Sequence, residues 1–168
     1  VELAKKALEA GNYSEAVSLL AECLEYPHHL GEGKLHGAQE NDFYYFMGCA
    51  YEGLGQNDKA VECWEQAIVG PTEPAAAMYY NDAKPDKIFY QGLALLKLNR
   101  MDEANGRFHK LTTYGEKYLF DKVKMDYFAV SLPDLLIWED DLTIRNVIHC
   151  KYMMLSLIHI SEPMRLQL

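Results

Sequence analysis

One spacing of small and bulky residues occurs three times in this chain and limits the folds that it can adopt. Near the middle of the sequence, Gly55 is followed by Ala60, Trp64 and Ala67 at intervals of 5, 4 and 3 residues. The same intervals separate two further sets, each shifted by 44 positions: Gly11, Ala16, Leu20 and Cys23, and then Asn99, Ala104, Phe108 and Leu111. A fixed period of this length is typical of repeat architectures, in which each unit buries its apolar face against its neighbours.

Each set predicts two antiparallel helices joined by a tight turn. Gly and Asn tolerate the left-handed backbone conformation that commonly follows a helix C-terminus. The polar residues after them predict the start of a second helix, which we expect to be capped with help from Asn12, Asn57 and Asp102. The alanine of each set lets the two helices approach closely, and the bulky residue one turn later fills the space beyond it. The sequence therefore predicts an all-α fold.

The middle unit resembles the tetratricopeptide repeat. Eight positions agree with that repeat in spacing and size class: Tyr44, Met47, Gly48, Tyr51, Gly55, Ala60, Trp64 and Ala67. The third unit keeps Gly92 and Leu95 ahead of Asn99, and the first unit is truncated at its front but keeps Ala4. The resemblance implies a solenoid of antiparallel helix pairs over residues 1–154, with units at about 1–26, 41–70 and 85–117 and a diverged helical segment at 118–154.

A tetratricopeptide unit has about 34 residues, so the longer period leaves ~10 extra residues per unit. We expect them in the connections 26–41 and 70–86, which are rich in Gly, Pro, Asn and Asp. Connections of this length are often functional. Two interpretations stay open: the loops cover helix ends, with Met78, Tyr79 and Tyr80 folding back onto the first helices, or those helices hold a partner.

The C-terminal third departs from the repeat. Residues 117–130 place Leu119, Phe120 and Val123 at helical spacing, which predicts a helix that buries this face and stops before Pro133. The following acidic residues Glu139, Asp140 and Asp141 are interpreted as a solvated turn before the next helix. The last segment, "LSLIHISEPMRLQL" at 155–168, resembles a translated sequencing adapter and is expected to be a non-native tail.

A second resemblance concerns the whole of residues 1–154. The stretches "LGEGKLHGAQENDFYYFMGCAYEGLG" and "YYNDAKPDKIFYQGLALLKLNRMDEA" resemble the C-terminal repeat region of a bacterial family of large proteins. In that family the repeats follow a domain similar to carbohydrate-active β-sandwiches. The resemblance implies a fragment that acts as a scaffold or, alternatively, as a helical arm that positions or dimerises a glycoside-processing domain absent from this chain. Because no apolar leader or membrane-length apolar run is visible, we expect a cytoplasmic location.

The residues themselves predict no catalysis, no metal and no cofactor. Lys and Arg total 16 against 25 Asp and Glu, and this net charge of −9 argues against nucleic acid as a partner. The four cysteines lack zinc-binding spacing. The stretch "GEGKL" lacks the phosphate-loop pattern, and the histidines at 28, 29 and 36 share a loop without a carboxylate at a suitable spacing.

The remaining candidate is a binding surface on the first helices of the units. In tetratricopeptide arrays, fixed positions of these helices line the concave surface. The candidates here are Tyr45, Cys49, Glu52, Phe89, Leu93, Leu96 and Lys97. Of the positions that the first unit contributes to this surface, only Lys5 is basic, and Asp86 in the third unit has the wrong sign, so a clamp for a peptide carboxylate is not expected. The sequence predicts an apolar surface that contacts a protein segment or another domain of the same parent protein.

Overall fold

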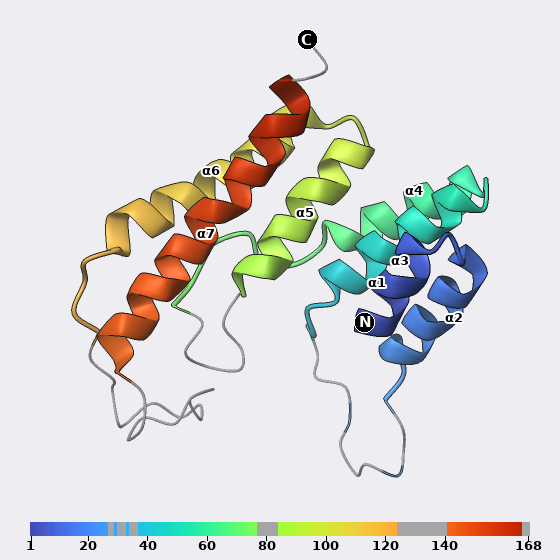
Figure 1. Ribbon diagram of the computed structural model, residues 1–168, viewed down its shortest axis with the longest axis horizontal. Helices are drawn as coiled ribbons and strands as arrows, with labels where there is room; N and C mark the ends of the chain where they lie inside the picture. The colour runs from blue at the N-terminus through green and yellow to red at the C-terminus, as the bar shows by residue number, and fades with distance from the viewer. Residues whose placement is uncertain (27–28, 30–32, 34–36, 77–83, 124–140, 166–168) are drawn as a thin grey trace. The chain divides into compact units, whose positions relative to one another are not determined.

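A computed structural model describes residues 1–26, 29, 33, 37–76, 84–123 and 141–165, the residues from 156 on by their backbone alone. Every regular element in these ranges is a helix, which confirms the predicted all-α class (Figure 1). The helices are α1 (Glu2–Glu9), α2 (Tyr13–Leu24), α3 (Asn41–Gly53), α4 (Asn57–Ala67), α5 (Pro85–Lys97), α6 (Met101–Tyr118) and α7 (Leu142–Arg165).

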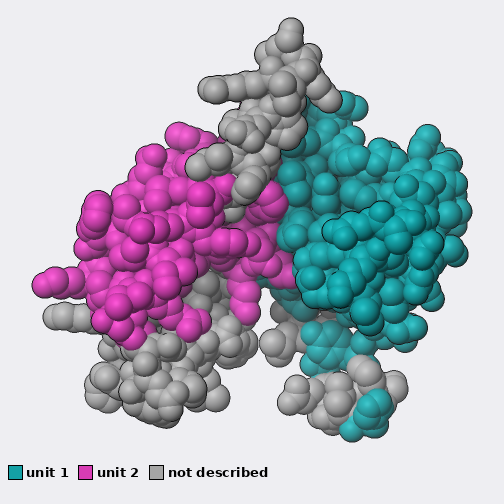
Figure 2. All heavy atoms as spheres, in the orientation of Figure 1, with its two compact units in different colours: residues 1–70, 90–104 teal, residues 71–89, 105–168 magenta. Residues whose placement is uncertain are grey.

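Two compact units divide the chain, and each is described by itself (Figure 2). Unit 1 comprises residues 1–70 and 90–104, and unit 2 comprises residues 71–89 and 105–168. In unit 1, each of the first three helices packs against the next one along the chain, and α1 also touches α3. The predicted extra residues at 77–83, with Met78 to Tyr80 among them, lie outside the described residues, as do His28, His36 and 124–140.

The three turns between paired helices have the same hydrogen bonds. Gly11, Gly55 and Asn99 all take the left-handed conformation, with φ of 76°, 71° and 59°. In each turn the amide of this residue donates to the carbonyl three residues earlier, and the next amide donates to the carbonyl five residues earlier. This pair of bonds is the Schellman motif, which satisfies the last carbonyls of a helix. The predicted role of the Gly or Asn is therefore confirmed at all three sites.

The alanine and the bulky residue of each set are buried as predicted. Ala16, Ala60 and Ala104 are at most 1% exposed, and Leu20, Trp64 and Phe108 are at most 5% exposed. In the middle pair the need for a small residue is steric, because a Cβ added at Gly48 would lie 2.3 Å from Nε1 of Trp64. The absence of a side chain at Gly48 therefore lets the indole of α4 lie directly on α3.

The predicted helix caps are wrong at two sites. Asn12 occupies the N-cap position of α2, but its side-chain oxygen accepts no hydrogen bond from a backbone amide of the helix. Its Nδ2 instead donates to Oε2 of Glu15 at 3.4 Å. Gln56, not Asn57, occupies the N-cap of α4, and within the described structure its side chain makes no capping bond. The first turns are instead held by the backbone, since the carbonyls of both N-cap residues accept from the amides four residues later.

Asparagines from other helices complete two helix C-termini. Asn41, at the start of α3, is 3% exposed and donates from Nδ2 to the carbonyls of Ala67 and Val69, both at 2.8 Å. Asn146 of α7 donates to the carbonyl of Tyr118 at 2.7 Å, where α6 ends. Carbonyls in the last turn of a helix lack intrahelical donors, so these amides stabilise the helix ends.

The helix predicted for residues 117–130 is wrong in its described part. Helix α6 ends at Tyr118, and residues 121–123 have no regular structure. Phe120, which was expected to be buried, is 87% exposed. Where α6 ends, the carbonyl of Tyr118 accepts from the amide of Asp121 in a tight turn and from Asn146, which is 28 residues away in sequence. Local spacing carries no information about that contact.

In unit 2 the core lies between α7 and parts of α5 and α6. Ile88, Leu111 and Met153 are fully buried together. Gly115 of α6 allows a close approach to α7, because an added Cβ would lie 2.7 Å from the carbonyl oxygen of Cys150. The backbone of α7 continues through position 155 to Arg165, so this helix extends into the segment for which a non-native origin is predicted.

Candidate interaction surface

Three aromatic rings from α3 and α5 lie against one another in unit 1. The ring centroids of Phe46 and Tyr90 are 5.2 Å apart, those of Tyr45 and Phe46 5.4 Å, and those of Tyr45 and Tyr90 5.5 Å. All three side chains are partly exposed. These distances fall in the range of favourable aromatic pairs, which contribute beyond the area that they bury. We call Tyr45, Phe46 and Tyr90 the aromatic surface.

A lysine from α1 borders the aromatic surface. The Nζ atom of Lys5 lies 5.3 Å from the centroid of Phe46, within the range of a cation–π interaction. The same Nζ donates to Glu2 at 2.8 Å, and this hydrogen bond raises the pKa of Lys5. The aromatic surface is therefore bordered by the Lys5–Glu2 ion pair, with the Lys5 ammonium beside the ring of Phe46.

On its other side, the aromatic surface continues into a group of polar residues. Burial raises the pKa of Tyr45, whose side chain also interacts with Cys49. Burial likewise raises the pKa of the Cys49 thiol, although the nearby positive charge of Lys97 opposes the shift. Lys97 forms an ion pair with Glu52 and lies 5.3 Å from the ring centroid of Trp64. These contacts bring together four of the seven predicted surface residues.

The other three predicted residues lie elsewhere or have no described contact to this group. Leu93 and Leu96 are partly buried on the unit 1 part of α5. Phe89 belongs to unit 2, where its ring centroid lies 6.0 Å from that of Phe108 beside a buried core.

Sequence reasoning missed Phe46 and Tyr90, although a signal for them existed. The two residues are 44 positions apart, which is the period of the repeat. They therefore occupy equivalent positions of successive units and could have been paired by the repeat alone. They were overlooked because positions assigned to the concave surface in tetratricopeptide arrays do not include them.

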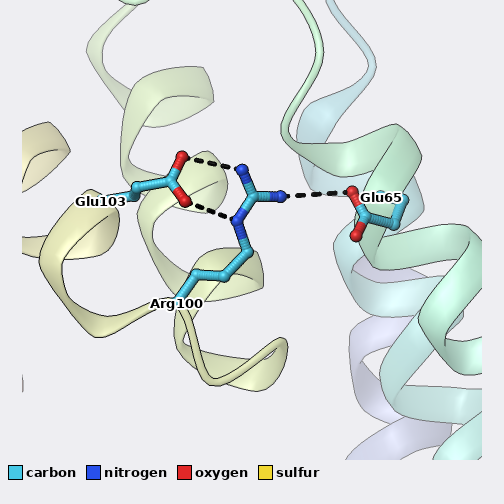
Figure 3. Close-up of polar contacts among 3 residues, drawn as sticks. All are labelled: Glu65, Arg100 and Glu103. Carbon is cyan, nitrogen blue, oxygen red and sulfur yellow. Dashed lines mark hydrogen bonds and ion pairs between the residues drawn. The ribbon is translucent and has the colours of Figure 1, made fainter.

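An arginine network links α4 to the start of α6 within unit 1 (Figure 3). Arg100 donates to both carboxylate oxygens of Glu103 at 2.7 Å and to Glu65 at 3.4 Å. The hydrogen bond to Glu103 raises the pKa of the arginine. Because all three side chains are well exposed, we expect the network to contribute little to stability.

The described residues offer little that resembles a catalytic or metal site. In the described ranges, no group of three His, Cys, Asp or Glu residues could hold a metal ion. The four cysteines are free thiols. Burial raises the pKa of Cys63 to about 11, and it also raises the pKa of Cys150. Protonated thiols are poor nucleophiles, so these two side chains behave as small apolar core residues.

The net negative charge is concentrated in the sequence of one unit. Unit 1 contains 14 acidic and 6 basic residues, whereas unit 2 contains 11 acidic and 10 basic residues. The aromatic surface therefore belongs to the strongly acidic part of the chain. A field of this sign attracts cationic partners and repels polyanions.

No protein-family profile matches the sequence, and no solved structure matches the chain significantly. In the described part of the chain, no helix is both long enough and apolar enough to cross a lipid bilayer.

Proposed function

We propose that this chain is a non-catalytic protein-interaction module of the tetratricopeptide type, and that its aromatic surface binds a segment of another protein or of another domain of its parent protein. The observation that carries the proposal is the contact among Tyr45, Phe46 and Tyr90, three partly exposed rings on α3 and α5. Aromatic side chains are enriched at protein interfaces because they provide a large contact area at a small cost in conformational entropy.

The neighbouring charges support a peptide-like partner. Lys5 and the Lys97–Glu52 pair border the aromatic surface and offer charged groups of both signs. A polar rim around an apolar centre is the usual anatomy of a protein interface. The similar turns of the three helix pairs support the solenoid arrangement, since they place each second helix after its first in the same local way.

A peptide selection tests the proposal. A displayed library of random peptides of about 16 residues is selected for binding to the immobilised full chain. This length is sufficient for a peptide to present a helical face. We expect enriched peptides with several apolar residues. The substitution Tyr90→Ala should weaken their binding at least about tenfold, because an interface aromatic contributes ~2 kcal/mol or more. Tyr13→Ala is the matched control, since Tyr13 is a partly buried tyrosine of unit 1 outside the aromatic surface.

A second variant keeps the test valid if Tyr90→Ala fails to fold. Lys5→Glu reverses the charge beside Phe46 without removing a ring, and it should change the charge preference of the selected peptides. The proposal is wrong if no peptide is enriched. It is equally wrong if folded Tyr90→Ala or Lys5→Glu binds the enriched peptides as the wild type does.

A further inference from the structure

Helix α7 carries apolar side chains on two faces, and only one face is buried. Cys150 and Met153 are fully buried in the core of unit 2. Along the opposite face, ahead of the segment expected to be non-native, three apolar residues are more than half exposed: Ile144 at 59%, Ile148 at 63% and Tyr152 at 52%. We call these three residues the α7 stripe.

The spacing of the stripe makes it a continuous surface. Its members follow one another at intervals of 4 residues, which places them along one side of an α-helix. Single exposed apolar residues are common on protein surfaces, but a contiguous row of large ones marks an interaction site. A helix that is apolar on both faces needs a second cover besides its own core.

The charges of α7 indicate the chemistry of that cover. Lys151 is exposed and follows Ile148 by three residues, so it lies on the same side of the helix as the stripe. Arg145 flanks the stripe one residue after Ile144. No acidic side chain lies between 142 and 155. Asp141, just before them, is occupied as the cap of α7, since its Oδ1 accepts from the amides of Thr143 and Ile144.

We propose that the α7 stripe is a second docking surface, and that it binds an acidic amphipathic helix of a partner protein. Leucine-like side chains of such a helix would cover the stripe, while its carboxylates would face Lys151 and Arg145. A second copy of α7 fits less well, because pairing two stripes would bring the basic residues of both helices together. This surface belongs to unit 2 and does not depend on the aromatic surface of unit 1.

A pair of synthetic peptides tests the charge preference. Both have about 18 residues and the same leucine face, and one carries Glu where the other carries Lys. Binding to the full chain is measured by fluorescence anisotropy at low and high salt. We expect the acidic peptide to bind at least about tenfold more tightly than the basic one, with the difference reduced by salt.

Two substitutions localise the binding. Ile148→Glu places a negative charge in the centre of the stripe and should weaken binding of the acidic peptide at least about tenfold. Val61→Glu is the matched control, because Val61 is 45% exposed on α4 of unit 1, and it should leave binding unchanged. Both positions are exposed, so neither variant should lose the fold, which circular dichroism checks.

Four results would overturn the proposal. Equal binding of the two peptides would remove the charge preference, and equal binding to wild type and Ile148→Glu would remove the site. Binding of phosphatidylserine vesicles that depends on Ile148 would assign the stripe to a membrane surface instead. Absence of peptide binding, together with an Ile148→Cys thiol that resists maleimide in peptide mapping, would show that another part of this chain already covers the stripe.

Discussion

The substitution Gly48→Ala tests the close packing of α3 and α4. In an exposed helix interior, replacing Gly with Ala stabilises by about 1 kcal/mol. At Gly48 the new Cβ would lie 2.3 Å, 2.5 Å and 2.9 Å from three atoms of the Trp64 indole. Overpacking costs about 1–3 kcal/mol. The upper end applies here, because the ring is rigid and only 5% exposed. The net expectation is a loss of ~2 kcal/mol in the free energy of unfolding.

Urea unfolding followed by circular dichroism measures this loss. Gly106→Ala is the control for helix propensity, because Gly106 lies within α6 and an added Cβ there meets nothing within 4 Å. It should gain about 1 kcal/mol, which puts the two variants ~3 kcal/mol apart. In a Trp64→Leu background the cost of Gly48→Ala should largely disappear, since the overlapping ring is gone. The reasoning is refuted if Gly48→Ala is as stable as Gly106→Ala, or if its cost is unchanged without the indole.

Three further predictions concern the core, a helix end and alkaline pH. Leu20→Ala should lower the free energy of unfolding by ~3 kcal/mol because Leu20 is fully buried. Leu3→Ala should change it by less than about 0.5 kcal/mol because Leu3 is 68% exposed. Similar melting temperatures for the two variants would contradict the assigned core. Asn41→Ala should lower the free energy of unfolding by about 1–3 kcal/mol, because two carbonyls at the end of α4 lose their donor. Thermal melts should show a smaller change for Asn12→Ala, because the side-chain amide of Asn12 donates to the exposed Glu15. Burial in the folded state raises the pKa of Cys63 from 9.0 to about 11, so the unfolded chain releases this proton at a lower pH. The free energy of unfolding should therefore fall by up to ~2 kcal/mol as the pH rises between these values. Urea unfolding of Cys63→Ala should show less of this loss, and an equal loss would disprove the assignment.

The helix pairs could be predicted because their signals are local. Each pair depends on a left-handed residue, an alanine five positions later and a bulky residue four positions after the alanine. These residues lie in one turn and in the helix that follows it. Gly11, Gly55 and Asn99 accordingly share the same backbone bonds. The errors arise where distant residues decide the structure. Helix α6 ends just before the exposed Phe120, where Asn146 binds the carbonyl of Tyr118, and no periodicity near residue 120 encodes that bond.

The candidate surface could be predicted only in part for a related reason. Tyr45 and Lys97 were found from positions within single helices, and the structure links both to Cys49. Phe89 was grouped with Tyr45 by the same rule, but its ring lies against Phe108 in unit 2. The α7 stripe was not predicted, because an exposed apolar row and a buried one have the same sequence pattern until the packing of the helix is known.

A nuclear magnetic resonance titration of the isotope-labelled chain with a peptide enriched in the selection locates the binding surface directly. We expect the largest chemical-shift changes on the amides of residues 42–52 and 90–97, which carry the aromatic surface and the residues linked to it. Tyr90→Ala should reduce those changes while leaving the spectrum of α2 intact. If the changes are centred on α2 and α4 while residues 42–52 and 90–97 are unaffected, the aromatic surface is not the binding site.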